Sequence, residues 1–138
     1  MDEPAIEVTP IGWVESPLTD RDTAPKQGDE GAPEAWLVLR PEVVEGLDGI
    51  RPGDEIIVLT WLNRARRGVL RVHPRGDPAR AEQGVFNTRS PDRPNPIGLH
   101  VVEILSLDGH RVRVANLEAL HGTPVLDLKP VLEPRGRR

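Results

Sequence analysis

Short apolar segments separated by glycine and proline recur along the whole chain, and this pattern restricts the fold more than any other sequence feature. The 138 residues include 15 prolines and 13 glycines, which interrupt helices and favour turns. Strand-like apolar runs lie at 5–14, 36–39, 55–62, 68–73, 99–106 and 110–117. A succession of short strands joined by such turns predicts a mainly β domain, either a barrel or a sandwich.

The segment EIIVLTWL at 55–62 carries the strongest strand signal, because it is rich in β-branched residues and has the length of a buried strand. Only residues 41–46 resemble the start of a helix. Pro41 suits the first helical position, Glu42 suits the first turn, and Gly46 should end the helix early. The sequence therefore predicts one strand-rich domain with few short helices.

A hairpin is predicted where Asp108 and Gly109 separate two alternating apolar runs. An Asp-Gly pair is a strong hairpin signal because both residues tolerate positive φ. In the second arm, Val112 and Val114 should face the core, while Arg111 and Arg113 should face solvent.

Composition excludes several classes of site. The chain has no cysteine, so disulfides, thiolate metal sites and cysteine nucleophiles are excluded. The four histidines, at 73, 100, 110 and 121, lack metal-ligand spacing. We therefore expect no metal. No dinucleotide fingerprint, P-loop or nucleophile elbow is present either.

Charge and hydropathy point to a cytoplasmic protein. The net charge of −4 argues against a general nucleic-acid coat protein, although it allows a local basic patch. No apolar stretch approaches the roughly 18 residues that a membrane helix needs, and no secretory leader is visible. We expect a soluble protein that does not contact a membrane.

The segment RSPDRPNPIG at 89–98 lies in one of two long segments, 19–35 and 74–98, that are poor in apolar residues. Its three prolines restrict the backbone, so Arg89, Arg93 and Asn95 are displayed at set angles. Such a stiff loop suits a ligand site because little entropy is lost on binding. Alternatively, it is a structural turn whose polar side chains cap neighbouring backbone groups.

Two further segments also allow two interpretations. In LHGTPVLDLKP at 120–130, Asp127 and Lys129 should share one strand face, as a proton-handling pair or as an ordinary surface ion pair. In WLNRARRGVLR at 61–71, four arginines follow the best strand. They either meet RNA phosphates or form a solvated edge.

Together, four blocks of the chain resemble the TrmO/TsaA-like family over about residues 9–131. The blocks are IGWVESP at 11–17, PKQ at 25–27, GVFNTRSPDRPNPIG at 84–98 and GTPVLDLKP at 122–130. The resemblance implies a compact β-barrel-like domain that works as a homodimer. We delimit this domain to 1–131 and treat 132–138 as a basic tail.

The resemblance also implies the activity. Members bind S-adenosyl-L-methionine and methylate N6 of N6-threonylcarbamoyladenosine beside the tRNA anticodon. Carried over position by position, the cofactor contacts are Pro25, Lys26, Gln27, Asn63, Arg64, Arg89, Leu99, Leu120, His121, Gly122 and Thr123.

The chemistry of methyl transfer suggests further roles. Arg89 suits the cofactor carboxylate. Asp127 is the candidate acceptor of the N6 proton, with Lys129 orienting it or binding the substrate carboxylate. Arg93 and Asn95 are candidate substrate contacts.

Four positions depart from the family pattern. The family often has histidine at Asn63, aspartate at Glu118 and His121, and tyrosine at Val131. Two other functions therefore stay open: methylation of another nucleoside or of a small molecule, and a non-catalytic cofactor-binding module.

Overall fold

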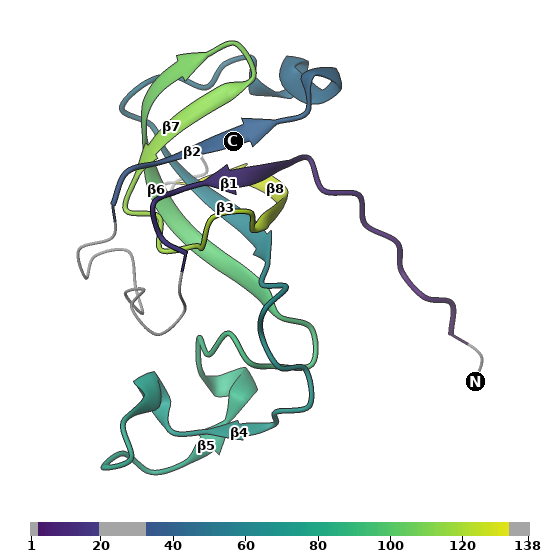
Figure 1. Ribbon diagram of the computed structural model, residues 1–138, viewed down its shortest axis with the longest axis vertical. Coiled ribbons are helices and arrows are strands. Elements are labelled where there is room, and N and C mark those ends of the chain that lie inside the picture. The colour runs from purple at the N-terminus through teal and green to yellow at the C-terminus, as the bar shows by residue number, and fades with distance from the viewer. Residues whose placement is uncertain (1–2, 20–32, 133–138) are drawn as a thin grey trace.

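Six antiparallel strands close into a small barrel, which confirms the predicted mainly β, barrel-like fold (Figure 1). The computed structural model describes residues 3–19 and 33–132. Around the ring the strand order is β1-β2-β7-β6-β3-β8. The strands are β1 Gly12–Glu15, β2 Ala35–Leu39, β3 Glu55–Trp61, β6 Ile97–Asp108, β7 Arg111–Ala115 and β8 Pro124–Pro130.

The barrel interior is filled by the alternate apolar residues of these strands. Val58 on β3, Ile104 on β6 and Leu37 on β2 are fully buried. Val112 and Val114 on β7 are also fully buried, whereas Arg111 and Arg113 lie toward solvent, as their alternation predicted. Burial of one residue in two supplies the main hydrophobic stabilisation of such a barrel.

The β6–β7 hairpin turns one residue later than predicted. Asp108 pairs with Arg111, so the two turn residues are Gly109 and His110. Only Gly109 has a positive φ, of +60°. The Asp-Gly signal located the hairpin correctly, but Asp108 extends the strand because its backbone remains in the ladder.

The predicted helix is a 3₁₀ helix, η2, over Pro41–Leu47, with Pro41 in its first turn. It continues through Gly46, so the prediction that this glycine ends the helix was wrong by one residue. The apolar run at 5–14 forms a strand only at Gly12–Glu15. Residues 3–10 form an arm that extends from the barrel (Figure 1).

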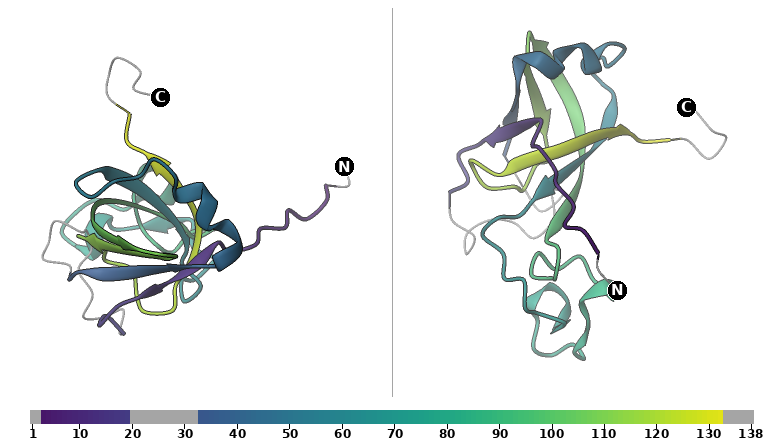
Figure 2. Two further views of the ribbon diagram at one scale, coloured as in Figure 1. Left: turned by 90° about the horizontal axis from the view of Figure 1, so that it is seen from above. Right: turned by 90° about the vertical axis from the view of Figure 1, so that its right-hand side faces the viewer.

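Residues 62–96, called the lobe below, leave the barrel between β3 and β6. Figure 1 and the right-hand view of Figure 2 show them as a separate body beneath the barrel. The run predicted at 68–73 contributes only a two-residue strand. The elements of the lobe are β4 Arg71–Val72, η3 Pro74–Gly76, β5 Gln83–Gly84 and η4 Val85–Asn87. Nowhere in 3–19 or 33–132 does a helix have the length and apolar character needed to cross a membrane.

Candidate functional site

A cavity of about 460 Å³ lies between the barrel and the lobe. Its walls come from four segments that are distant in sequence: the end of β3 with residues 62–65, the lobe at 86–93, the start of β6, and the turn before β8. Apolar side chains and polar groups both line it. The lining residues are Leu59, Leu62, Asn63, Arg64, Ala65, Phe86, Thr88, Arg89, Ser90, Pro91, Arg93, Ile97, Gly98, Leu99, His100, Glu118, Ala119, Leu120 and Thr123.

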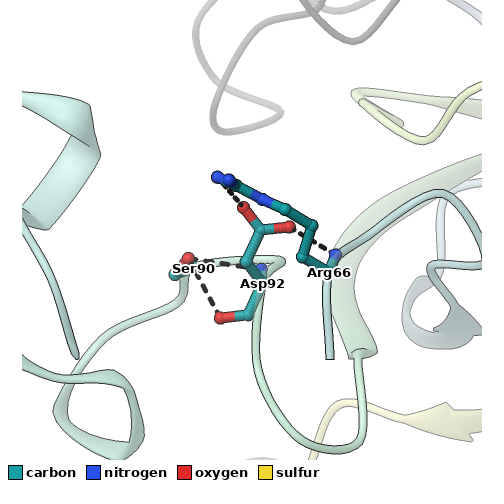
Figure 3. Close-up of polar contacts among 3 residues, drawn as sticks. All are labelled: Arg66, Ser90 and Asp92. Carbon is teal, nitrogen blue, oxygen red and sulfur yellow. Dashed lines mark hydrogen bonds and ion pairs between the residues drawn. The ribbon is translucent and has the colours of Figure 1, made fainter. Parts of the chain in front are cut away.

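Asp92 anchors the proline-rich block to the segment that leaves β3 (Figure 3). Its buried carboxylate accepts a hydrogen bond from the Arg66 backbone N–H at 2.8 Å and from Arg66 Nη2 at 3.3 Å. The Ser90 hydroxyl also bridges the Asp92 backbone, accepting from its N–H at 3.3 Å. The Asp92 side chain thus joins two walls of the cavity. Nothing in the sequence had pointed to this role of Asp92.

Arg93 and Asn95, the predicted substrate contacts, are both engaged by the loop itself. Arg93 donates to the backbone carbonyls of Val85, Thr88 and Ser90. Asn95 accepts a hydrogen bond from Arg67 Nη2 at 2.9 Å and does not line the cavity. These bonds favour the structural interpretation for both side chains, although Arg93 also forms part of the cavity wall.

Arg89 differs from these residues. It is exposed, it lines the cavity, and within the described residues its side chain has no hydrogen bond or ion pair. A guanidinium that the lobe does not use is available for an anionic group of a ligand.

The turn from Leu120 to Thr123 closes another wall. Gly122 has φ +84° at the third position of this turn, and the Thr123 N–H donates to the Leu120 carbonyl at 3.1 Å. The Gly122 N–H donates to the backbone carbonyl of Val14 at 2.8 Å. Both N–H groups are therefore used within the fold and hold the turn in place.

Of the predicted cofactor contacts in this turn, Leu120 and Thr123 line the cavity, whereas His121 and Gly122 do not. His121 instead accepts a hydrogen bond from the Ser16 N–H at 3.2 Å through Nδ1. This bond ties the turn to the chain that follows β1.

The predicted contacts Pro25, Lys26 and Gln27 lie outside the described residues. The chain up to that segment is held at the cavity, because Arg64 Nη1 donates to the carbonyl of Thr19 at 2.9 Å. Thr19 is the last residue described before 20–32. Asn63, Arg64 and Leu99 line the cavity as the resemblance implied.

Asp127 and Lys129 share one face of β8, as predicted, and form an ion pair at 3.2 Å. Neither lines the cavity between barrel and lobe; Lys129 lines a smaller one of about 180 Å³. Asp127 is nevertheless opposite Leu59 in the β3–β8 ladder, and Leu59 is a lining residue. Its backbone position is thus one cross-strand pair away from the cavity wall.

Sequence reasoning missed a buried polar network inside the cavity end of the barrel. Thr60 Oγ1 lies 2.8 Å from His100 Nε2, and His100 Nδ1 lies 2.6 Å from Glu118 Oε1. Thr60 is fully buried and His100 is 5% exposed. The only sequence signal was His100 on the inward side of an alternating strand, where an apolar residue is the norm.

The charges at the cavity are unequal. Three arginines, Arg64, Arg89 and Arg93, line it with a single carboxylate, that of Glu118, among the residues the structure describes. No group of three or more metal-ligating side chains occurs within that same part of the chain. The charged side chains that line the cavity are therefore mainly cationic, with one carboxylate among them.

Residues 13–134 match the family described as the tRNA-methyltransferase O N-terminal domain. A protein of Methanothermobacter thermautotrophicus, named "Probable S-adenosyl-L-methionine-binding protein", is 45% identical over 96% of this chain and 95% of its own length. An S-adenosyl-L-methionine-binding protein of Archaeoglobus fulgidus is 47% identical over 87% of this chain and 85% of its own.

Solved structures of TrmO have the same fold. One is 30% identical with a TM-score of 0.76 and aligns with 96% of this chain. Another, from Pseudomonas aeruginosa, is 29% identical with a TM-score of 0.73 and aligns with 94% of it. The present chain covers 57% of each of those longer chains.

Proposed function

The chain belongs to the family of the tRNA-methyltransferase O N-terminal domain, and from this premise we propose that it is an S-adenosylmethionine-dependent methyltransferase acting on tRNA in the cytoplasm. We propose further that its acceptor is N6 of N6-threonylcarbamoyladenosine beside the anticodon. The observation that carries the proposal is the cavity between barrel and lobe, which brings together Arg64, Arg89, Leu99, Leu120 and Thr123.

The cavity fits the proposed cofactor in size and in chemistry. Its volume of about 460 Å³ lies within the range of about 300–1,000 Å³ typical of small-molecule sites. Arg89 suits the carboxylate of the methionine part. Leu99 and Leu120 supply apolar walls for the adenine.

S-adenosylmethionine supplies an electrophilic methyl group on its sulfonium. The residues of the chain then have to align the acceptor nitrogen with that methyl group, and alignment alone can supply several kcal/mol. We also propose Pro25, Lys26, Gln27, Asn63 and His121 as cofactor contacts; of these, Asn63 lines the cavity.

Asp127 remains our proposed acceptor of the N6 proton, with Lys129 orienting it. Support comes from its backbone position opposite Leu59, which lines the cavity, and from its ion pair with Lys129 at 3.2 Å. Methylation by Asp127→Asn at the wild-type rate would remove Asp127 from the mechanism.

Two features of the lobe support an RNA substrate. Residues 62–96 contain eight arginines against three carboxylates, although the whole chain has a net charge of −4. Phe86 lines the cavity and is 80% exposed. A cationic surface suits phosphates, and an exposed aromatic ring beside a cavity suits an unstacked base. The anticodon loop offers both.

We also propose that the protein is a homodimer. An apolar strip covers the outer face of β3 and β6, in the pairs Trp61–Ile97, Leu59–Leu99 and Ile57–Val101. Val101 is 47% exposed. Glu55 and Glu103 flank one end of the strip, and Lys129 lies beside Ile57, so a second copy packed by two-fold symmetry can pair acid with base.

Sedimentation at increasing protein concentration tests the dimer. The wild-type chain is expected to dimerise, whereas Val101→Glu, which inserts a charge into the strip, is expected to remain monomeric. A wild-type monomer at all concentrations would overturn the dimer proposal and leave the cofactor proposal intact.

The function itself is tested by incubating the purified protein with threonylcarbamoylated tRNA and labelled cofactor. Nucleoside mass spectrometry should then detect the N6-methylated product. The matched control is the same tRNA without the threonylcarbamoyl group, which should stay unlabelled. Labelling of both tRNAs alike would contradict the proposed acceptor.

A non-catalytic cofactor-binding module is the second candidate. The archaeal relatives of similar length are named for S-adenosylmethionine binding alone, and the present chain covers 57% of the solved TrmO chains. Cofactor binding without transfer to any tRNA pool would favour this candidate.

A further inference from the structure

Glu118 is the single carboxylate that lines the cavity within the described part of the chain, and a histidine side chain holds it in place. Its Oε1 is 2.6 Å from His100 Nδ1. Its Oε2 has no hydrogen bond to any described residue, and the side chain is 18% exposed. Glu118 therefore lines the cavity with a carboxylate that is held through one oxygen, while its other oxygen has no hydrogen bond to a described residue.

Three arginines line the same cavity, so a positively charged ligand group would be repelled from most of it. Charges interact strongly in such partly enclosed sites because solvent screening is reduced. S-adenosylmethionine carries a carboxylate together with two positive centres, the sulfonium and the α-ammonium. If the arginines attract its carboxylate, its positive part requires a separate anion.

We propose that Glu118 binds a positive centre of S-adenosylmethionine, and that His100 and Thr60 are positioning residues that hold its carboxylate in place. This proposal rests on the cofactor site proposed above. Glu118 thereby determines which end of the cavity receives the positive part of the cofactor.

One arrangement of hydrogens satisfies the whole network. In a neutral His100, Nδ1–H donates to Glu118 and Nε2 accepts the hydrogen bond from the Thr60 hydroxyl. Buried polar groups are costly unless they are paired. Thr60 is fully buried, so its hydroxyl holds the ring in the rotamer that directs Nδ1 to Glu118.

Gly98 provides the space in which the Thr60 and His100 side chains meet. A Cβ at Gly98 would lie 2.4 Å from Thr60 Oγ1 and 2.8 Å from His100 Nε2. Gly98 pairs directly with Thr60 between β6 and β3. The missing side chain at 98 is therefore what lets Thr60 and His100 meet.

Calorimetry with two ligands tests the proposal. Glu118→Gln is expected to weaken S-adenosylmethionine binding by about tenfold or more, the scale of one charge-assisted hydrogen bond. S-adenosylhomocysteine keeps the ammonium and lacks the sulfonium charge. A loss confined to the first ligand identifies the sulfonium as the partner of Glu118, and an equal loss for both identifies the ammonium.

Glu45→Gln is the matched control. It makes the same change of side chain and net charge at an exposed position of η2, outside the cavity lining, and should leave both affinities unchanged. Glu118→Asp, which keeps the charge, should retain more affinity than Glu118→Gln. Unaltered affinity of Glu118→Gln for both ligands would overturn the proposal.

The positioning role has its own pair of variants. His100→Asn keeps a donor near the position of Nδ1 and should preserve most of the affinity, whereas His100→Leu keeps the bulk without the donor and should reproduce the effect of Glu118→Gln. Equal affinities for these two variants would remove His100 from the proposal. Wild-type protein that binds neither ligand would instead refute the proposed cofactor site.

Discussion

At the scale of single residues, some side chains of the cavity are available to a ligand, whereas others hold the surrounding loop in place. Arg89 has no partner within the described residues and is available to a ligand, whereas Arg93, four positions later, donates to three backbone carbonyls. Both belong to the same proline-rich block and look equivalent in the sequence. Only the fold decides which guanidinium holds the loop and which one is available.

Gly98→Ala provides a prediction at this scale. The added methyl group would overlap Thr60 Oγ1 and His100 Nε2, both in the buried network. We expect lower stability by about 1–3 kcal/mol, the usual cost of overpacking a core, and weaker cofactor binding. Denaturant unfolding and calorimetry measure the two effects.

Gly68→Ala is its control, because nothing lies within 4 Å of a Cβ at that position and its φ is not positive. The control should change neither quantity. Full stability and affinity in Gly98→Ala would contradict the tight packing described for Thr60 and His100.

At the scale of elements, the proline-rich block is stiff for two reasons, and the sequence revealed one of them. Pro91, Pro94 and Pro96 restrict the backbone by themselves. The second reason is long-range: the Asp92 carboxylate binds Arg66, 26 residues earlier. Contacts of that kind cannot be inferred from one sequence, because local spacing does not report which segments meet.

Asp92→Ala should loosen the lobe without unfolding the barrel. The change leaves the Arg66 N–H without its partner, at a cost of about 1–3 kcal/mol. We expect faster amide exchange at residues 64–67 and 89–95 and weaker cofactor binding, with little change in the barrel strands. Hydrogen exchange by mass spectrometry measures this.

The control is Asp77→Ala, which removes an exposed carboxylate of the same lobe. Asp77 makes local interactions: it accepts a hydrogen bond from the Ala79 N–H and forms an ion pair with Arg80 at 3.9 Å. Its exchange should change only near residue 77. Unchanged exchange at 64–67 in Asp92→Ala would show that the prolines alone hold the block.

The difference between local signals and long-range contacts explains which features the sequence could predict. Strand runs, the β6–β7 hairpin and the inward faces follow from alternation, which is a local signal. The cavity wall at Leu99 and Leu120 was expected only through the family resemblance, whereas the proline-rich block by itself had already indicated Arg89. The Thr60–His100–Glu118 network escaped prediction because its members are separated by 40 and 18 positions.

At the scale of the whole molecule, charge is divided between two bodies. The lobe carries an excess of arginine, whereas the chain as a whole is anionic. Figure 2 shows the lobe standing apart from the barrel. The cavity lies between the two bodies.

Phe86→Ala should reduce RNA affinity without altering cofactor affinity. Base stacking on an aromatic side chain contributes about 1–3 kcal/mol, and Phe86 is 80% exposed at the cavity. Fluorescence anisotropy with a labelled anticodon stem-loop measures the loss. Because no charge changes, the dependence of affinity on salt should keep its slope.

Leu70→Ala is the control for this prediction, since Leu70 is 60% exposed on the same lobe and does not line the cavity. It should bind RNA as the wild type does. Equal losses in both variants would indicate general apolar contact and would exclude a stacking role for Phe86.

The most direct test of the cofactor site is amide chemical-shift mapping of the ¹⁵N-labelled protein during titration with S-adenosylmethionine. We expect the largest shifts at Arg89, Leu99, Leu120 and Thr123, which line the cavity, and small shifts on the far side of the barrel at Leu37 and Val112. Saturable binding with shifts confined to β2 and β7, or no shifts at all, would contradict a cofactor site between barrel and lobe.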